Sequence, residues 1–253
     1  MKIKVLNTGI LGVNTLIVPL CENKVFVVDP AACKTSRDSG KIVDFLKRNN
    51  LDCVAVVLTH SHFDHITGIA EVKAAFPAAR IAIHKNEACE LDNPPGPMGE
   101  RVIRFFGLEA LMDVVASQPP ADVLLSDRCT LEVLLKSSDE KKAVELKNSS
   151  ASSFSEASFE INSSSNLAHA LSSWQVFLTP GHTPGSICLY NKNEKILISG
   201  DTLFEDGWGR TDMYGGNERE IMRSLAFLNK TIPSGTIVYS GHDSHCFILG
   251  GEN

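Results

Sequence analysis

The sequence predicts an α/β protein in which two β-sheets pack face to face and helices cover their outer surfaces. Short apolar runs follow one another at the start of the chain with no helical pattern between them. Strand-like and helix-like segments then alternate, and this order occurs twice along the chain. Two packed sheets with helices outside accommodate such an order. The composition, 43% hydrophobic and 21% charged, is that of an ordinary globular domain.

The first half of the chain supplies one set of elements. Residues 3–6, 15–18 and 25–28 are rich in Val, Ile and Leu and predict three successive strands. Hydrophobic spacing and run length then predict a helix at 41–47, a buried strand at 53–58, a helix at 66–76, a strand at 80–84 and one or two helices within 98–116 with Gly107 as a break.

The second half repeats the pattern after an unusual segment. Of the 37 residues at 137–173, 13 are serine, and the aromatic residues are only Phe154 and Phe159. So little apolar surface predicts a mobile surface insertion, dispensable for the fold, within a single domain spanning residues 1–253. The elements predicted after it are strands at 174–178, 186–190 and 195–198, a helix at about 218–228 and a last strand at 236–239.

Charge and cysteine usage narrow the classes of partner and compartment. Lysine and arginine total 24 against 30 acidic residues, a net charge of −6, which argues against a nucleic-acid binder with a broad basic face. No apolar run approaches the roughly 20 residues that a membrane span needs, and the N-terminus lacks the continuous apolar stretch of a signal peptide. Seven scattered cysteines without a CxxC pair predict free thiols and a cytoplasmic protein. We expect a small-molecule substrate, no nucleic acid and no membrane, and the oligomeric state stays open.

The strongest chemical signal is the sequence THSHFDH at residues 59–65, directly after the predicted strand at 53–58. Histidine and aspartate are ordinary ligands of zinc and related metals. On a helix, His60 and His62 would point to nearly opposite faces. In a turn that leaves a strand they can converge on one ion, while Asp64 and His65 reach a second ion nearby.

Three further candidate ligands lie just after predicted strands. His182, Asp201 and His242 each follow an apolar strand, and a glycine precedes each of them. Loops at the carboxyl ends of strands converge, and glycine allows the sharp turn that brings a side chain close. Together with the first cluster, this gives too many ligands for one tetrahedral zinc and a suitable supply for two ions with open positions. His84 and His169 receive no role, and His245 stays open between a position near the site and the surface.

These motifs resemble those of the metallo-β-lactamase superfamily and, within it, its glyoxalase II-like (hydroxyacylglutathione hydrolase-like) branch. The matching segments are HSHFDH at 60–65, TPGHTPGS at 179–186, SGDTLF at 199–204, GRTD at 209–212 and SGH at 240–242. The resemblance covers nearly the whole chain, apart from the serine-rich segment and parts of 85–120. It is specific for the superfamily and says little about the substrate.

The resemblance implies a four-layer αββα sandwich and two divalent metal ions, zinc in the first place with iron or manganese as alternatives. The implied ligands are His60, His62 and His182 for the first metal, Asp64, His65 and His242 for the second, and Asp201 as a bridge. Asp64 is also our candidate catalytic residue. One major class of zinc lactamases carries cysteine where Asp201 stands, so lactamase activity is not expected. The chain stops shortly after His242, without the C-terminal helical domain that binds glutathione in longer glyoxalase II enzymes.

The expected function is a metal-dependent hydrolase that cleaves a thioester or similar activated ester with a metal-bound hydroxide. A thiol has a pKa near roughly 8.5 and can leave as thiolate unaided, and the sequence offers no clearly placed proton donor for a poorer leaving group. Arg210 and Asp212 are expected to pair with each other, and Phe204, Trp208 and Tyr214 are candidates for the mouth of the site. The alternative is an iron-dependent persulfide dioxygenase, which shares the fold and the GRTD motif.

Overall fold

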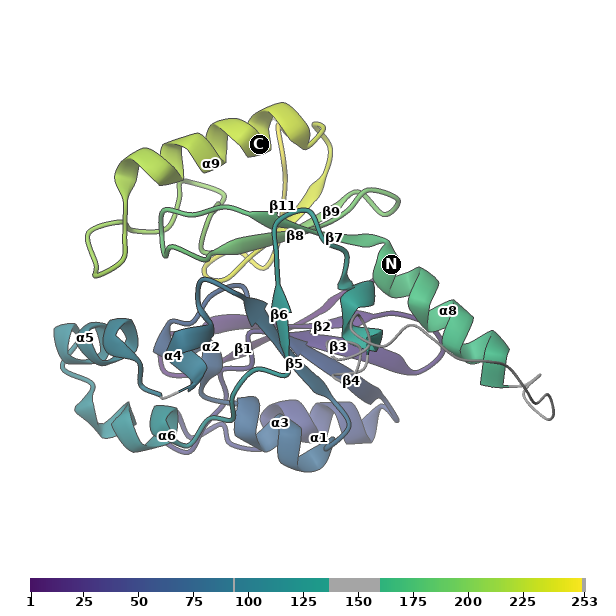
Figure 1. Cartoon of the computed structure of the whole chain (residues 1–253), viewed down its shortest axis with the longest axis horizontal. Helices are drawn as coiled ribbons and strands as arrows, with labels where there is room; N and C mark the ends of the chain where they lie inside the picture. The colour runs from purple at the N-terminus through teal and green to yellow at the C-terminus, as the bar shows by residue number, and fades with distance from the viewer. Residues whose placement is uncertain (93, 137–159, 252–253) are drawn as a thin grey trace, which may run out of the picture.

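The computed structural model describes residues 1–92, 94–136 and 160–251, and its first sheet comes entirely from the part before the serine-rich segment (Figure 1). The strands lie in chain order, with β1–β2–β3 antiparallel and β3–β4–β5–β6 parallel. Their bounds are β1 Lys4–Thr8, β2 Val13–Pro19, β3 Lys24–Val28, β4 Asp52–Val57, β5 Arg80–His84 and β6 Val123–Leu125.

The second sheet comes from the C-terminal part of the chain, in the order β11–β10–β9–β8–β7. Its bounds are β7 Trp174–Leu178, β8 Ile187–Asn191, β9 Ile196–Gly200, β10 Ile237–Ser240 and β11 Phe247–Ile248. Strands β7 and β9 both run antiparallel to β8, and β10 runs parallel to β9. The carboxyl ends of β7, β9 and β10 therefore meet at one edge of this sheet.

Helices cover the outer face of each sheet. In Figure 1, α1, α3 and α6 lie along the first sheet and α9 lies along the second, so that the layers run helix, sheet, sheet, helix. The helical bounds are α1 Lys41–Arg48, α2 Phe63–Ile66, α3 Ile69–Ala75, α4 Ala88–Asp92, α5 Pro97–Phe105, α6 Met112–Ala116, α8 Glu160–Ser172 and α9 Glu218–Thr231, with 3₁₀ turns at Glu109–Leu111 and Leu131–Leu135. The predicted α/β fold with a four-layer αββα sandwich is confirmed.

The alternation of side chains along each strand explains the layers. In β3, Val25 and Val27 face the helices, whereas Phe26 and Val28 face the second sheet. The ring of Phe26 packs edge-on against Trp174, with 5.4 Å between the ring centroids. Each large apolar side chain buried in this way contributes roughly 1.5–3 kcal/mol relative to exposure. The period-2 pattern of the sequence thus fills a core on both faces of one sheet.

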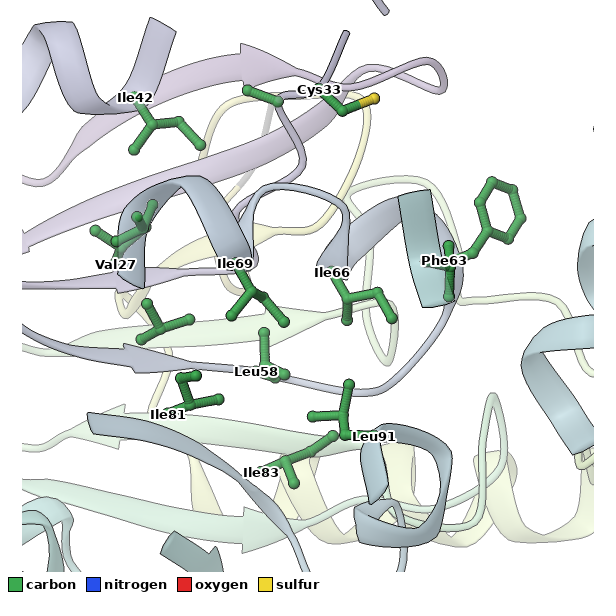
Figure 2. Packing of buried hydrophobic residues seen from close by; sticks show 14 of the residues in the cluster. Val27, Cys33, Ile42, Leu58, Phe63, Ile66, Ile69, Ile81, Ile83 and Leu91 are labelled. Carbon is green, nitrogen blue, oxygen red and sulfur yellow. The ribbon is translucent and has the colours of Figure 1, made fainter. Parts of the chain in front are cut away.

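The turn that carries the histidine cluster is held in place by apolar side chains that pack against the first sheet. Figure 2 shows Ile66 and Ile69 pointing toward Leu58, the residue that follows β4, among side chains from the neighbouring strands. Phe63 and Ile66 of α2 and Ile69 of α3 are each at most 1% exposed. This packing leaves Asp64, on the other side of α2, free to face the site.

The two sheets are hydrogen-bonded to each other at the edge where these turns lie. The backbone N–H of Asn14 donates to the carbonyl oxygen of Gly241 over 2.7 Å, and that of Ile187 donates to the carbonyl oxygen of Thr59 over 2.9 Å. Gly241 follows β10 and Thr59 follows β4. The loops after strands of different sheets are therefore held side by side.

The predicted elements are confirmed within a few residues at their ends, and Gly107 does separate α5 from the following turn, with a φ of +64°. The short elements that were not predicted include α2, α4, β6, β11 and the 3₁₀ turn at Leu131–Leu135. Because β11 follows β10, the prediction that 236–239 is the last strand is wrong.

The serine-rich segment divides into two parts. Residues 137–159, and with them Phe154 and Phe159, lie outside the described residues, so the expected mobility is not addressed there. From Glu160 to Ser172 the chain forms α8, where Leu171 is fully buried in the core between the sheets and Leu167 packs against it. The expectation of a mobile insertion up to residue 173 is thus corrected for α8. Leu167 and Leu171, four residues apart, form the apolar face of α8, which the high serine content of the segment did not suggest.

Within the described ranges, none of the helices has both the length and the apolar character that a membrane crossing requires.

Candidate metal centre

Residues 59–65 bring four candidate ligands to the carboxyl end of β4. His60, His62, Asp64 and His65 are all buried, and His65 is fully so. The extended conformation of His62 ends the strand–turn segment, and α2 begins at the next residue. The backbone N–H of His65 donates to the carbonyl oxygen of His62 over 3.0 Å. The short turn therefore fixes the relative positions of all four side chains.

The second sheet brings the other three candidates to the same place. His182, Asp201 and His242 follow β7, β9 and β10, whose carboxyl ends share an edge. Glycine is required beside them because a Cβ on Gly241 would lie 2.1 Å from Oδ1 of Asp201. A Cβ on Gly209 would likewise lie 2.9 Å from Nδ1 of His182. The chain packs against the ligand candidates as closely as its backbone allows.

One group of possible ligands consists of three histidines. Side-chain nitrogens of His60, His62 and His182 lie within 4.8 Å of one another. Their Nε2 atoms are buried and have no hydrogen-bond partner among the described residues. Burial lowers the pKa of all three, to about 3 for His62, so these imidazoles are neutral and their lone pairs are available. We call them the three-histidine half.

A second group, Asp64, His65 and His242, contains a carboxylate and is called the carboxylate half. A third set, Asp29, His60 and His65, also has its ligand atoms within 4.8 Å of one another and overlaps both halves. Nε2 of His242 lies 3.3 Å from Oδ2 of Asp64, and Nε2 of His65 lies 3.6 Å from the same oxygen. Burial alone would lower the pKa of both histidines, but the nearby carboxylates have the larger effect. They raise the pKa of His242, and they raise the pKa of His65 well above its usual value. Conversely, the histidines lower the pKa of Asp64 against the opposing effect of burial.

Asp201 lies between the two halves. Its Oδ2 is 3.6 Å from Nε2 of His182 and 3.5 Å from Nε2 of His242, and its Oδ1 is 3.6 Å from Nε2 of His65. Oδ1 is buried and has no hydrogen-bond partner among the described residues. Buried polar atoms without partners cost free energy unless a ligand satisfies them. The unpartnered nitrogens and this oxygen fit metal ions, and the His and Asp clusters suit a dinuclear metal site.

Three of the histidines are oriented through their Nδ1 atoms. Nδ1 of His60 lies 3.0 Å from the hydroxyl of Thr59, and Nδ1 of His182 lies 2.8 Å from the carbonyl oxygen of Arg210. Nδ1 of His65 lies 3.0 Å from Oδ2 of Asp29. Such partners fix the ring orientation and leave Nε2 as the ligand atom.

Asp29 was not singled out from the sequence. It directly follows β3, is 2% exposed and has a φ of +48°. Its carboxylate accepts hydrogen bonds from the backbone N–H of Thr59 (2.8 Å) and the hydroxyl of Thr59 (2.6 Å), besides facing His65. Its position just past a strand, like that of the predicted ligands, is the signal that could have found it.

Glu87 was also missed, and it joins two of the ligand loops. This fully buried carboxylate accepts hydrogen bonds from the backbone N–H and the hydroxyl of Ser61, between His60 and His62. Its other oxygen accepts from the backbone N–H of Gly185 over 2.7 Å, in the loop that carries His182. Burial raises its pKa despite these hydrogen bonds. No motif in the sequence marks this residue.

A cavity of about 420 Å³ opens onto the candidate ligands. Its size lies in the usual range for small-molecule sites. The candidate ligands in its lining are His62, Asp64, His182, Asp201 and His242. The rest of the lining is Leu11, Val102, Phe106, Phe204, Trp208, Gly209, Arg210, Met213 and Asp243.

The other predicted positions can now be placed. Phe204 and Trp208 line the cavity as predicted. Tyr214 is outside the lining, and the guanidinium carbon of Arg101 lies 4.2 Å from the centroid of the Tyr214 ring. Arg210 pairs with Asp212 as predicted, through two hydrogen bonds. His245 is exposed, outside the cavity lining. All seven cysteines are free, three of them buried.

Comparison with known proteins agrees with this geometry. The model of the metallo-beta-lactamase superfamily matches residues 9–242. The chain belongs to the metallo-beta-lactamase superfamily. Within this metallo-hydrolase superfamily, it is 27% identical over 234 residues to the probable metallo-hydrolase YqgX of Bacillus subtilis, covering 91% of this chain and 89% of that protein.

Two other superfamily members are similar to it. The hydroxyacylglutathione hydrolase of Bdellovibrio bacteriovorus is 27% identical over 222 residues, 87% of this chain and 59% of that longer protein. The crystal structure of the BLEG-1 B3 metallo-beta-lactamase superposes with a TM-score of 0.71 at 26% identity, covering 98% of this chain and 95% of that one. The superfamily fold is therefore shared across relatives named for different substrates.

Proposed function

We propose that the protein is a metal-dependent hydrolase that cleaves a thioester or a similarly activated ester. The observation that carries this proposal is a cavity of small-molecule size that ends on buried, unpartnered histidine nitrogens and the Asp201 carboxylate. His60, His62 and His182 would hold one ion, Asp64, His65 and His242 a second, and Asp201 would contact both. Two divalent ions, when bound, lower the pKa of water toward neutrality and polarise a substrate carbonyl.

The chain's own residues supply position and charge. Asp29, Thr59 and the Arg210 carbonyl orient the imidazoles of the candidate centre. Asp64, our candidate catalytic residue, is buried and lines the cavity, where its carboxylate would orient the attacking water by accepting a hydrogen bond. A substrate that covers the apolar part of the lining would displace water from it, which would strengthen electrostatic interactions in the site.

The leaving group is inferred from the groups that line the cavity. Apart from the candidate ligands, the described lining holds no histidine, lysine, cysteine or tyrosine that could protonate a departing atom. Asp243 is the one carboxyl there outside the ligand set. A thiol, with a pKa near roughly 8.5, leaves as thiolate without a donor, whereas an alcohol with a pKa near about 16 does not. The name of the Bdellovibrio relative, which refers to a glutathione thioester, supports the same bond type.

A matched pair of substrates tests the proposal. A thioester and an alkyl oxyester of one acyl group are compared at one pH, with protein loaded with zinc, iron or manganese. We expect kcat/KM for the thioester to exceed that for the oxyester by several orders of magnitude. Equal rates in the wild type that become unequal in Asp243→Asn would identify Asp243 as a proton donor and overturn the inference from the leaving group. His245→Ala is the matched control because His245 is exposed.

Two other outcomes would replace the proposal rather than refine it. Hydrolysis of a β-lactam without hydrolysis of thioesters would assign the chain the activity for which the BLEG-1 enzyme is named. Oxygen consumption with glutathione persulfide by the iron-loaded protein, without hydrolysis, would assign it the dioxygenase reaction that the GRTD motif also allows.

A further inference from the structure

The wall of the cavity, meaning its lining apart from the candidate ligands, is largely apolar, although much of it faces solvent. Its apolar members are Leu11, Val102, Phe106, Phe204, Trp208 and Met213. Three of these side chains remain substantially exposed: Leu11 at 41%, Phe106 at 37% and Trp208 at 49%. Large apolar side chains gathered at the mouth of a cavity mark a ligand-binding surface, because leaving them in water has a cost.

These side chains come from separate parts of the chain. Leu11 lies in the turn between β1 and β2, Phe106 ends α5, and Trp208 lies in the loop after β9. Their convergence on one opening is therefore a property of the site, and not a by-product of one amphipathic element.

Charge on this wall is already compensated. Arg210 is the single basic side chain in the described lining, apart from the candidate ligands. Its Nε and Nη2 groups donate to the two carboxylate oxygens of Asp212, over 2.7 Å and 2.8 Å. The guanidinium also lies over the rings of Phe105 and Phe106, 5.1 Å and 5.6 Å from their centroids. Hydrogen bonding to Arg210 lowers the pKa of Asp212 to about 2, so Asp212 stays ionised throughout the neutral range.

The remaining charged group on this wall is negative. Asp243 lines the same cavity, so Asp212 and Asp243 together exceed the single positive charge of Arg210. Among the described lining residues, a substrate carboxylate would find no Lys or Arg side chain other than Arg210, which is bonded to Asp212, and it would lie near the carboxylate of Asp243. Desolvation of a charge without a partner is unfavourable.

We propose that the site takes thioesters that are uncharged and apolar on both sides of the scissile bond, and disfavours those of anionic thiols such as glutathione. This inference rests on the proposed function. Glutathione carries two carboxylates and an ammonium group, whereas N-acetylcysteamine is a neutral thiol. The wall selects neutral thioesters by contact with Leu11, Phe106 and Trp208, and it selects against glutathione thioesters because it lacks a free cation.

Binding of stable analogues tests the inference without turnover. The probes are S-hexyl-N-acetylcysteamine and S-hexylglutathione, thioethers that share the hexyl arm and contain no thioester bond to cleave. The readout is the fluorescence of Trp208, since the other tryptophan, Trp174, is fully buried between the sheets. With zinc-loaded protein, we expect the neutral probe to bind at least about tenfold more tightly, an effect the size of one well-placed charge or apolar contact.

Variants separate the apolar and the electrostatic contributions. Phe106→Ala should lower the affinity for the neutral hexyl probe by roughly tenfold or more, as expected for the loss of one aromatic contact. Leu124→Ala, an exposed leucine on β6 outside the cavity lining, is the matched control and should change nothing. Asp212→Asn removes the carboxylate that pairs with Arg210. It should raise the affinity for S-hexylglutathione several-fold and leave the affinity for the neutral probe unchanged. Trp208→Phe should remove the signal.

Failure of this inference can be told from failure of the proposed function. Equal or tighter binding of S-hexylglutathione, or binding of neither probe, would overturn the inference. Preferential hydrolysis of a glutathione thioester over its N-acetylcysteamine counterpart would also overturn it and leave the proposed thioester hydrolysis standing. Preferential binding of the neutral probe with no thioester turnover would leave the selectivity of the cavity intact and refute the reaction.

Discussion

The two halves of the candidate metal centre differ in the protonation of their histidines and in whether carboxylates lie beside them. In the three-histidine half, the ligand nitrogens are buried and neutral, and they have no partner among the described residues. In the carboxylate half, Asp64 lies 3.3 Å from His242 and 3.6 Å from His65, and carboxylates raise the pKa of both histidines. His242 is also more open, with 20% of its side chain exposed, whereas His65 has none.

From this difference we expect the three-histidine half to be ready to accept a metal ion and the carboxylate half to release protons when a metal ion binds. A metal that binds the three-histidine half meets free lone pairs and displaces few protons. A metal that binds the carboxylate half competes with protons that the site itself stabilises. We therefore expect the three-histidine half to bind metal more tightly, although it contains no carboxylate of its own.

The largest expected effect follows replacement of the residue that the halves share. Asp201→Ala should lower metal occupancy in both halves, because its carboxylate lies within 3.6 Å of ligand nitrogens from each. The loss of affinity should exceed the roughly 10–100-fold that removal of an outer partner costs. Elemental analysis of metal-loaded, desalted protein measures it, with the exposed Asp206→Ala as control. Loss from one half alone would show that Asp201 does not bridge.

Asp29→Asn should act mainly on the carboxylate half. The change keeps the size of the side chain but removes the negative charge that faces Nδ1 of His65 at 3.0 Å. We expect metal affinity in this half to fall by about 10–100-fold, with a smaller effect on the other half through Thr59. Metal titration measures both steps. Asp38→Asn is the matched control, since Asp38 accepts backbone N–H groups of Gly9 and Cys33 and belongs to none of the three sets of possible metal ligands.

Acidification should empty the carboxylate half first. A metal binds deprotonated imidazole, and a raised pKa means that His65 and His242 take up protons at a higher pH than free histidine does. The lowered pKa values of the three-histidine half, about 3 for His62, delay protonation there. Metal content after dialysis at falling pH should therefore drop in two steps, separated by at least about one pH unit. Simultaneous loss of both ions would contradict the distinction.

The smallest effect is expected at Glu87, which serves the three-histidine half alone. Its two oxygens accept backbone N–H groups from Ser61 and Gly185, so Glu87→Gln would turn an amide NH₂ toward one of these donors. Leaving one buried donor unsatisfied costs roughly 1–3 kcal/mol of folding free energy. We expect metal affinity of this half, measured in the same titration, to fall several-fold.

The control for that variant is a glutamate of similar burial and bonding. Glu90 accepts the backbone N–H groups of Met98 and Gly99 and contacts no ligand loop, so Glu90→Gln should lower the melting temperature comparably without changing metal affinity. An equal change of metal affinity in both variants would mean that the effect at Glu87 is one of general stability.

Much of the fold could be predicted because it rests on local patterns. The apolar runs that form β2, β3 and β4 are buried on both faces of the sheet, and each run can be recognised from a short stretch of sequence without knowledge of its neighbours. The elements that were missed are short, such as β6 and β11, and depend on pairing with a neighbouring strand. Helix α8 was missed because two leucines among many serines suffice once a core is there to receive them.

The candidate ligands could be predicted because they follow strands in recognisable motifs, whereas the residues that orient them could not. Asp29 and Glu87 have no motif, and their roles depend on backbone N–H groups brought near them by tertiary structure. The pairing of Arg210 with Asp212 was expected, but its position over Phe105 and Phe106 depends on where α5 lies. Sequence identifies ligand types, and the fold determines their partners.

Titration of metal-free protein with zinc near neutral pH, with bound metal per chain as the readout, decides whether the centre is dinuclear and its halves unequal. We expect saturation at two ions per chain, bound in two steps of which the first is tighter. Saturation at no more than one ion per chain, even with metal in excess, would contradict this expectation.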